Sequence, residues 1–188
     1  DWHSITDRTR NLRGNSHWES PAEVIKSAKY SYMLDKWLGQ PNYVEVWVEK
    51  DALVDIVGQA CRKLDVPYFS CRGYTSQSEM WSAAMRLRYQ YDKELKIILH
   101  LGDHDPSGID MTRDIQERLN MFGADVYVKR IALTMQQIKK YSPPPNPAKI
   151  TDSRCGEYIK KYGYSSWELD ALEPDVITKL ITKEVEKL

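Results

Sequence analysis

The sequence predicts an α/β fold in which a parallel four-stranded sheet carries helices on both faces. The first observation is that runs of apolar residues begin near positions 44, 66, 96 and 126. The second is that a helical spacing of apolar residues fills each gap between these runs. Strands that alternate with helices form βαβ units with right-handed crossovers, so the strands run parallel and helices cover both faces.

The composition is that of a globular protein large enough for one sizeable domain, with 188 residues, 41% of them hydrophobic and 29% charged. Lys+Arg and Asp+Glu are both 27, so the overall charge is no evidence for a nucleic-acid partner. Three cysteines without a Cys-x-x-Cys spacing indicate neither a disulfide framework nor a zinc site. No apolar stretch has membrane-spanning length, and we expect a cytoplasmic protein without a membrane partner.

We divide the chain into three parts. Residues 1–42 are interpreted as an arm and linker helix that end a missing upstream domain, because the chain begins without methionine. Residues 43–135 contain the predicted sheet and form the core. Residues 136–188 are interpreted as an extension that packs on the core.

The arm contains a basic run and a predicted helix. The run at residues 8–13 is either a solvated connector or a phosphate-contacting arm. Ser20 and Pro21, with Glu23 in the first turn, are typical of a helix start. We expect this helix to continue to about Leu38.

The first half of the core contains two strands and two helices. Residues 44–48 predict a strand of Val and Trp, and residues 52–64 predict a helix with one apolar face. Residues 66–70 predict a second short strand. The loop that follows ends at Ser76, which is suited to cap a helix over residues 77–91.

The second half of the core repeats this order. Residues 96–101 predict a buried strand, and residues 107–122 predict a helix that Gly123 ends. Residues 126–133 predict the fourth strand.

The extension has a different pattern. A helix is expected from Thr134 to about Tyr141, followed by a rigid proline-rich linker at residues 143–147. Residues 149–163 are compatible with a turn and a short helix, and residues 174–188 predict a last amphipathic helix.

Three acidic residues follow two of the predicted strands. Glu49 comes directly after the first strand, and Asp103 and Asp105 follow the third. Strand ends on the same side of a parallel sheet are neighbours, so these carboxylates are expected to lie close together. Carboxylate oxygens favour a hard cation, Mg²⁺ above all, with Mn²⁺ as an alternative.

A structural interpretation of the same residues remains open. Asp105 is a good N-cap, and Asp103 can accept backbone N–H bonds in the turn. Lys50 can supply the counter-charge instead of a metal ion. Glu168 and Asp170 either add a further carboxylate or cap the last helix.

Three motifs in this order resemble the Toprim domain, most closely that of the topoisomerase VI A subunit and its meiotic double-strand-break relatives. They are Val-Glu-Lys-Asp-Ala at residues 48–52, Cys-Arg-Gly-Tyr at residues 71–74 and Gly-Asp-His-Asp-Pro-Ser-Gly-Ile at residues 102–109. The resemblance covers roughly residues 43–133. Trp-Glu-Leu-Asp-Ala-Leu at residues 167–172 is similar to a terminal motif of that family.

The resemblance implies a Rossmann-like Toprim fold that binds Mg²⁺ through Glu49, Asp103 and Asp105 and helps to break and rejoin DNA. Glu49 is alternatively a general acid or base, as proposed for Toprim enzymes. Lys50 and Arg72, with Gly73 beside them, are candidates to hold phosphate, although salt bridges to the acids explain the two cations equally well.

The 188 residues contain no winged-helix domain with a nucleophilic tyrosine, which in that family precedes the Toprim domain, and we expect residues 1–42 to be the end of such a domain. Tyr30 and Tyr32 are expected on a packed helix and do not replace that nucleophile. His104 occupies the variable position of Asp-x-Asp and is left out of the metal set, and His100 is expected to be a core histidine.

Three hypotheses about function follow. The first is a Mg²⁺-dependent phosphoryl-transfer module of a DNA-processing protein, with strand cleavage and rejoining of the topoisomerase VI type. The second is a Toprim nuclease with a metal-activated water, as in the overcoming-lysogeny-defect nucleases. The third is a non-catalytic nucleic-acid-binding domain. DNA is the expected partner, with RNA left open. The oligomeric state is also left open, with a homodimer as one possibility because the topoisomerase relatives act as dimers.

Overall fold

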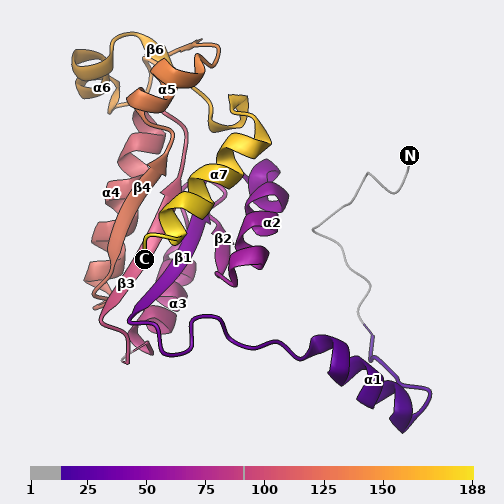
Figure 1. Cartoon of the computed structure of the whole chain (residues 1–188). Helices are drawn as coiled ribbons and strands as arrows, with labels where there is room; N and C mark the ends of the chain where they lie inside the picture. The colour runs from indigo at the N-terminus through magenta and orange to yellow at the C-terminus, as the bar shows by residue number, and fades with distance from the viewer. Residues whose placement is uncertain (1–13, 91) are drawn as a thin grey trace. The chain divides into compact units, whose positions relative to one another are not determined.

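The computed structural model describes residues 14–90 and 92–188 (Figure 1). The chain divides into two compact units, residues 1–35 and 36–188. In the first unit, the described residues contain helix α1 (Pro21–Ser31), whose N-cap Ser20 accepts a hydrogen bond from the Glu23 N–H at 3.3 Å. The basic run at residues 8–13 lies outside the described residues.

The predicted extension of α1 to Leu38 is wrong, because the helix ends at Ser31 and Tyr32 has extended backbone angles. No residue of α1 is buried. A helix of this length gains little stability without tertiary packing, so nothing compensates the cost of adding further turns.

The second unit is built on the predicted parallel sheet of four strands, in the order β2-β1-β3-β4. These strands are β1 (Asn42–Val48), β2 (Tyr68–Ser70), β3 (Leu95–Leu101) and β4 (Tyr127–Ala132). Val48 pairs with Leu101 in the register of β1 and β3. The residues that follow these two central strands therefore emerge side by side at one edge of the sheet.

Helices cover both faces of the sheet, as predicted (Figure 1). Val46 and Val48 point to one face and Trp47 to the other, so both sides of β1 are buried. The first face packs against α2 (Val54–Leu64) and α7 (Pro174–Val185), and the second packs against α3 (Gln77–Arg88) and α4 (Pro106–Met121).

Local signals set most of the boundaries. Ser76 caps α3 and Asp105 caps α4, and Gly123 follows α4 with a φ of 76°. The strand predicted from residue 66 begins two residues later, at Tyr68, because the Val66 N–H bonds to Cys61 and Pro67 has no N–H to donate. The helix predicted over residues 77–91 ends at Arg88.

The extension is more structured than the sequence indicates. Thr134 caps α5 (Met135–Tyr141) through a capping box with Gln137. The last two residues of the predicted linker form β5 (Asn146–Pro147), which pairs antiparallel with β6 (Ser165–Ser166). Between them lies α6 (Cys155–Tyr162), which resolves the open stretch at residues 149–163 as a turn and a helix.

No helix in the described ranges has both the length and the apolar character that crossing a membrane requires.

Candidate active site

The three predicted acids lie at the carboxyl end of the two central strands. Glu49 follows β1, and its carboxylate Oε2 accepts a hydrogen bond from the Asp103 N–H at 2.9 Å. Asp103 and Asp105 belong to residues 102–108, which connect β3 to α4 and which we call the acidic turn. The structure thus brings Glu49 into direct contact with the acidic turn.

Two glycines make room for the Glu49 carboxylate. A Cβ on Gly102 would lie 2.8 Å from Glu49 Oε2, and a Cβ on Gly108 would lie 3.0 Å from the same atom. The Gly108 Cβ would also lie 2.3 Å from the Asp103 carbonyl oxygen. Any side chain at these positions would push the carboxylate or the turn away.

Both aspartates also have the structural roles that the sequence left open. Asp105 caps α4, since its Oδ1 accepts a hydrogen bond from the Gly108 N–H at 2.6 Å. Asp103 is 7% exposed, and its Oδ1 accepts a hydrogen bond from the Leu169 N–H at 2.7 Å. The N–H that donates to the Asp103 carboxylate therefore belongs to the extension rather than to the turn.

Carboxylate oxygens remain for a cation. Within the described ranges, no hydrogen-bond donor reaches Glu49 Oε1 or Asp105 Oδ2. No group of three or more His, Cys, Asp or Glu side chains is already arranged to hold a metal ion among these residues. An all-oxygen donor set of this kind fits Mg²⁺, which binds through one or two carboxylates and retains several waters.

The acids are not fully compensated by the protein. Burial raises the pKa of Glu49 above its ordinary value, and the charge of Asp105 adds to the shift. Burial likewise raises the pKa of Asp103, with Glu49 adding to it. A divalent cation at this position would oppose both shifts because it favours the ionised carboxylates.

Arg130 is the main site residue that sequence reasoning missed. Its guanidinium donates hydrogen bonds to the carbonyl oxygens of Gly102 and Gly108, each at 2.8 Å, and to that of Asp103. These bonds fix the backbone of the acidic turn and place a positive charge near its carboxylates. The available signal was a charged residue inside a predicted strand, where a charge needs a partner.

His100 pairs with Arg130 in the register of β3 and β4 and is fully buried, as expected for a core histidine. Its Nδ1 lies 2.9 Å from Thr112 Oγ1, whereas Nε2 has no hydrogen-bond partner. Burial lowers the pKa of His100 to about 3, and the charge of Arg130 adds to this shift, so the ring is neutral.

Lys50 is held by carboxylates from two parts of the chain. Its Nζ lies 3.4 Å from Asp103 Oδ2 and 3.0 Å from Asp170 Oδ1, and it also bonds to Glu168. Burial alone would lower the pKa of Lys50, but the bonds to Glu168 and Asp170 raise it overall. The sequence left open whether Lys50 pairs with the acids or holds phosphate, and the structure shows the salt bridges. Glu168 and Asp170 both contact Lys50 and so lie beside the acidic turn.

Arg72 and Gly73 lie in the loop after β2, and the Gly73 N–H donates to the Glu49 carbonyl at 3.4 Å. Arg72 has a φ of 48° and its Nε is 3.3 Å from Asp51 Oδ1, while its side chain is 62% exposed. Gly73 has a φ of 79°, which favours glycine. The exposed guanidinium of Arg72 is accessible to a phosphate.

The variable residue of Asp-x-Asp anchors the acidic turn to the extension. The His104 ring is buried and has edge contacts with Tyr158, Tyr162 and Trp167, at centroid distances of 5.6, 4.7 and 5.8 Å. Its backbone pairs with Trp167 in an antiparallel bridge. The Tyr158 hydroxyl lies 2.8 Å from His104 Nδ1 and donates to the His104 carbonyl, also at 2.8 Å.

We expect Tyr158→Phe to lower the free energy of unfolding by about 2 kcal/mol, because His104 Nδ1 and the His104 carbonyl lose a buried hydrogen-bond partner. Urea unfolding followed by fluorescence measures the change. Tyr164→Phe is the control, since Tyr164 is 73% exposed and the substitution should shift stability by less than about 0.5 kcal/mol. Equal midpoints for the two variants would contradict this role of Tyr158.

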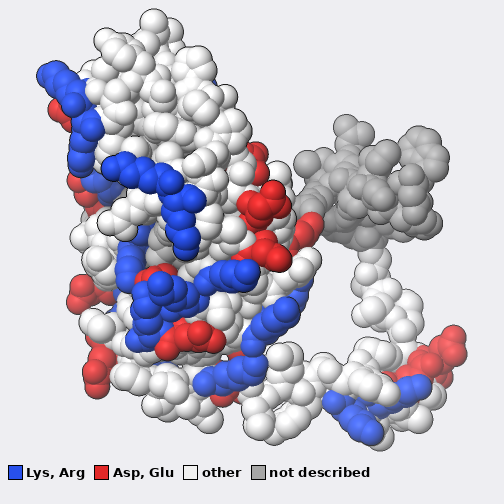
Figure 2. Space-filling view, turned by 45° about the horizontal axis from the view of Figure 1, so that its top comes forward, with Lys and Arg blue, Asp and Glu red and all other residues white. Residues whose placement is uncertain are grey.

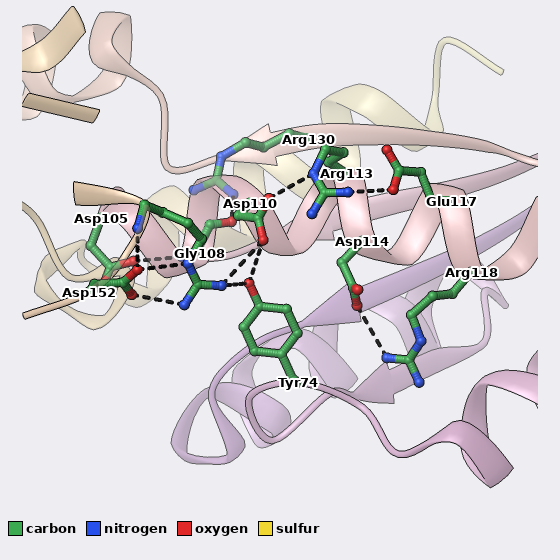
Figure 3. A network of polar contacts seen from close by, with 11 residues as sticks. Tyr74, Asp105, Gly108, Asp110, Arg113, Asp114, Glu117, Arg118, Arg130 and Asp152 are labelled. Carbon is green, nitrogen blue, oxygen red and sulfur yellow. Dashed lines mark hydrogen bonds and ion pairs between the residues drawn. The ribbon is translucent and has the colours of Figure 1, made fainter. Parts of the chain in front are cut away.

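A second network joins the loop after β2 to the extension across α4 (Figure 3). The Tyr74 hydroxyl donates to Asp110 Oδ2 at 2.8 Å, and Arg154 bonds to Tyr74 and to Asp110. Arg154 also forms a two-point ion pair with Asp152 at 2.8 Å for each bond. The loop that carries Arg72 and Gly73 is therefore fixed relative to the first turns of α4.

Comparison with known proteins adds no assignment: no protein-family model matches the chain, and no curated protein matches it.

Proposed function

We propose that the chain is a Mg²⁺-dependent phosphoryl-transfer module of a DNA-processing protein, of the Toprim type found in the topoisomerase VI A subunit. The observation that supports it most is the Glu49 carboxylate packed into the glycine-flanked acidic turn at the ends of two neighbouring strands. Glu49, Asp103 and Asp105 would hold the ion, and Mn²⁺ would replace Mg²⁺.

A divalent ion bound there would stabilise negative charge on the phosphate oxygens during cleavage of the DNA backbone. The protein groups position the reaction. Arg130 keeps the acidic turn from moving through its bonds to three carbonyl oxygens. The N-terminus of α4, directly after Asp105, adds a partial positive charge that favours an anion at this edge.

Glu49 is also suited to move a proton. Its pKa is raised mainly by burial, and a carboxyl with a raised pKa is a better general acid or base near neutral pH. In this alternative role Glu49 would exchange a proton with a leaving or attacking oxygen, and Asp103 and Asp105 would hold the ion.

Basic side chains near the sheet offer contacts to phosphate. Figure 2 shows several Lys and Arg side chains, with Asp and Glu side chains between them, on the face that is turned toward the viewer. Beside β4, a groove of about 380 Å³ is lined by several lysines and one acid, Glu184. These lysines are Lys129, Lys140, Lys183 and Lys187. Together with exposed Arg72 they support a polyanionic partner, although the net charge of the chain is zero.

The test is a cleavage assay with supercoiled plasmid DNA in Mg²⁺ or Mn²⁺, with labelled RNA as a parallel substrate. We expect ion-dependent conversion to nicked or linear DNA that a chelator stops. Glu49→Gln should reduce the conversion more than about 100-fold, because mutating a residue that only contacts a metal ligand already lowers metal affinity or activity about 10- to 100-fold. Glu94→Gln is the control, since Glu94 is exposed and directly precedes β3, at the opposite end of that strand from the acidic turn. Absence of conversion, or equal conversion by Glu49→Gln, would contradict the proposed activity of this chain.

A further inference from the structure

The ammonium group of Lys50 occupies a position enclosed by three carboxylates. It contacts Asp103 on the acidic turn, and Glu168 and Asp170 on the segment that leads into α7. The Lys50 side chain is 21% exposed and that of Asp103 is 10% exposed. Exposed surface pairs contribute little, but this partly buried group balances charges that would otherwise repel one another.

Asp103 connects the position of Lys50 to Glu49, and both oxygens of its carboxylate contact groups of the protein, since Oδ1 accepts a hydrogen bond from the Leu169 N–H. Its Oδ2 faces Lys50, and its backbone N–H bonds to the Glu49 carboxylate. Two-metal sites place two cations about 3.5–4 Å apart, so a cation of the protein beside Asp103 can take the place of a second ion. Here one of the two cation positions already contains a group of the protein.

We propose that the Lys50 ammonium is a built-in second cation, so that the site takes a single divalent ion, beside Glu49 and Asp105. This inference rests on the proposed function for its first ion but not for its second position. Lys50 also attaches the segment with Glu168 and Asp170 to the acidic turn, because the ammonium is the group that all three carboxylates share.

Counting bound Mn²⁺ by calorimetry and native mass spectrometry tests the proposal. The unmodified chain should bind one ion, and Lys50→Met should bind two, because Asp103, Glu168 and Asp170 then need another cation. The side chains of Glu168 and Asp170 are 39% and 45% exposed, which leaves them free to turn toward an ion. Lys50→Gln is a second neutral variant with the same expected count if Lys50→Met fails to fold.

Two further variants serve as controls. Lys50→Arg retains the charge and should bind the same number of ions as the unmodified chain. Arg113→Met removes a cation that pairs with two carboxylates outside the acidic turn, Asp110 at 2.7 Å and Glu117, and should also leave the count unchanged.

The outcomes separate the two proposals. Two ions on the unmodified chain, or no additional ion on the neutral Lys50 variants, would overturn the role of Lys50. No ion on the unmodified chain but one on Lys50→Met would support the role of Lys50 and contradict the metal site of the proposed function. No ion on any variant would overturn both.

Discussion

Gly108→Ala is expected to lower the free energy of unfolding by about 3 kcal/mol and to weaken divalent-ion binding, because overpacking typically costs 1–3 kcal/mol and more where the neighbour cannot move. The added methyl would lie 2.3 Å from the Asp103 carbonyl oxygen. That oxygen is fixed by Arg130, and the Gly108 N–H is fixed by Asp105. Neither side of the clash can relax without breaking the acidic turn.

The matched control is Gly156→Ala in α6, where an added Cβ meets nothing within 4 Å. This helical position should be unchanged or stabilised by up to about 1 kcal/mol, since alanine loses less entropy on folding. Urea unfolding of both variants measures the difference. Equal midpoints for Gly108→Ala and Gly156→Ala would show that the acidic turn can accommodate a methyl group, and would contradict the close packing at Gly108.

Arg86→Leu is expected to lower the free energy of unfolding by about 2 kcal/mol, although Arg86 lies outside the candidate site. Its partner Glu45 is 1% exposed, in the middle of β1, and accepts two hydrogen bonds from Arg86, at 2.8 and 2.9 Å. Removing one partner of a buried pair costs about 3–5 kcal/mol, and we expect less because the Arg86 side chain is 42% exposed.

Two variants sharpen this prediction. Combining Arg86→Leu with Glu45→Gln should recover part of the loss, because the unpaired buried charge is then absent. An amide oxygen at the Oε2 position still accepts from Trp47, and the amide NH2 at the Oε1 position can donate to the Tyr43 hydroxyl. Arg88→Leu is the control on the same helix, since Arg88 is exposed and makes a weak contact with the Met85 sulfur at 3.9 Å. An equal loss for Arg86→Leu and Arg88→Leu in thermal unfolding would contradict the account.

Much of the core could be predicted because its signals are local. The apolar runs that became β1 and β3 are buried on both faces, as expected for central parallel strands. Ser76 and Thr134 cap the helices predicted for them. The contact of Glu49 with the acidic turn follows from strand direction alone, since ends of neighbouring parallel strands meet at one edge.

The remaining features depend on contacts between residues far apart in the chain. Arg130 reaches the acidic turn from β4, and the aromatic contacts of His104 come from residues 158–167. No periodicity or spacing indicates such pairs. The end of α1 was mispredicted for the opposite reason, because the local pattern continues while no packing supports it.

The central claim is that Glu49 and the acidic turn bind a divalent cation, and calorimetric titration with Mg²⁺ tests it most directly. The chain should bind the ion, and the Asp103→Ala/Asp105→Ala variant, checked for folding by circular dichroism, should not. Binding that is unchanged in this variant would place the ion elsewhere. No binding to the unmodified chain, even with a DNA oligonucleotide present, would leave Glu49, Asp103 and Asp105 as structural acceptors and contradict the proposed function.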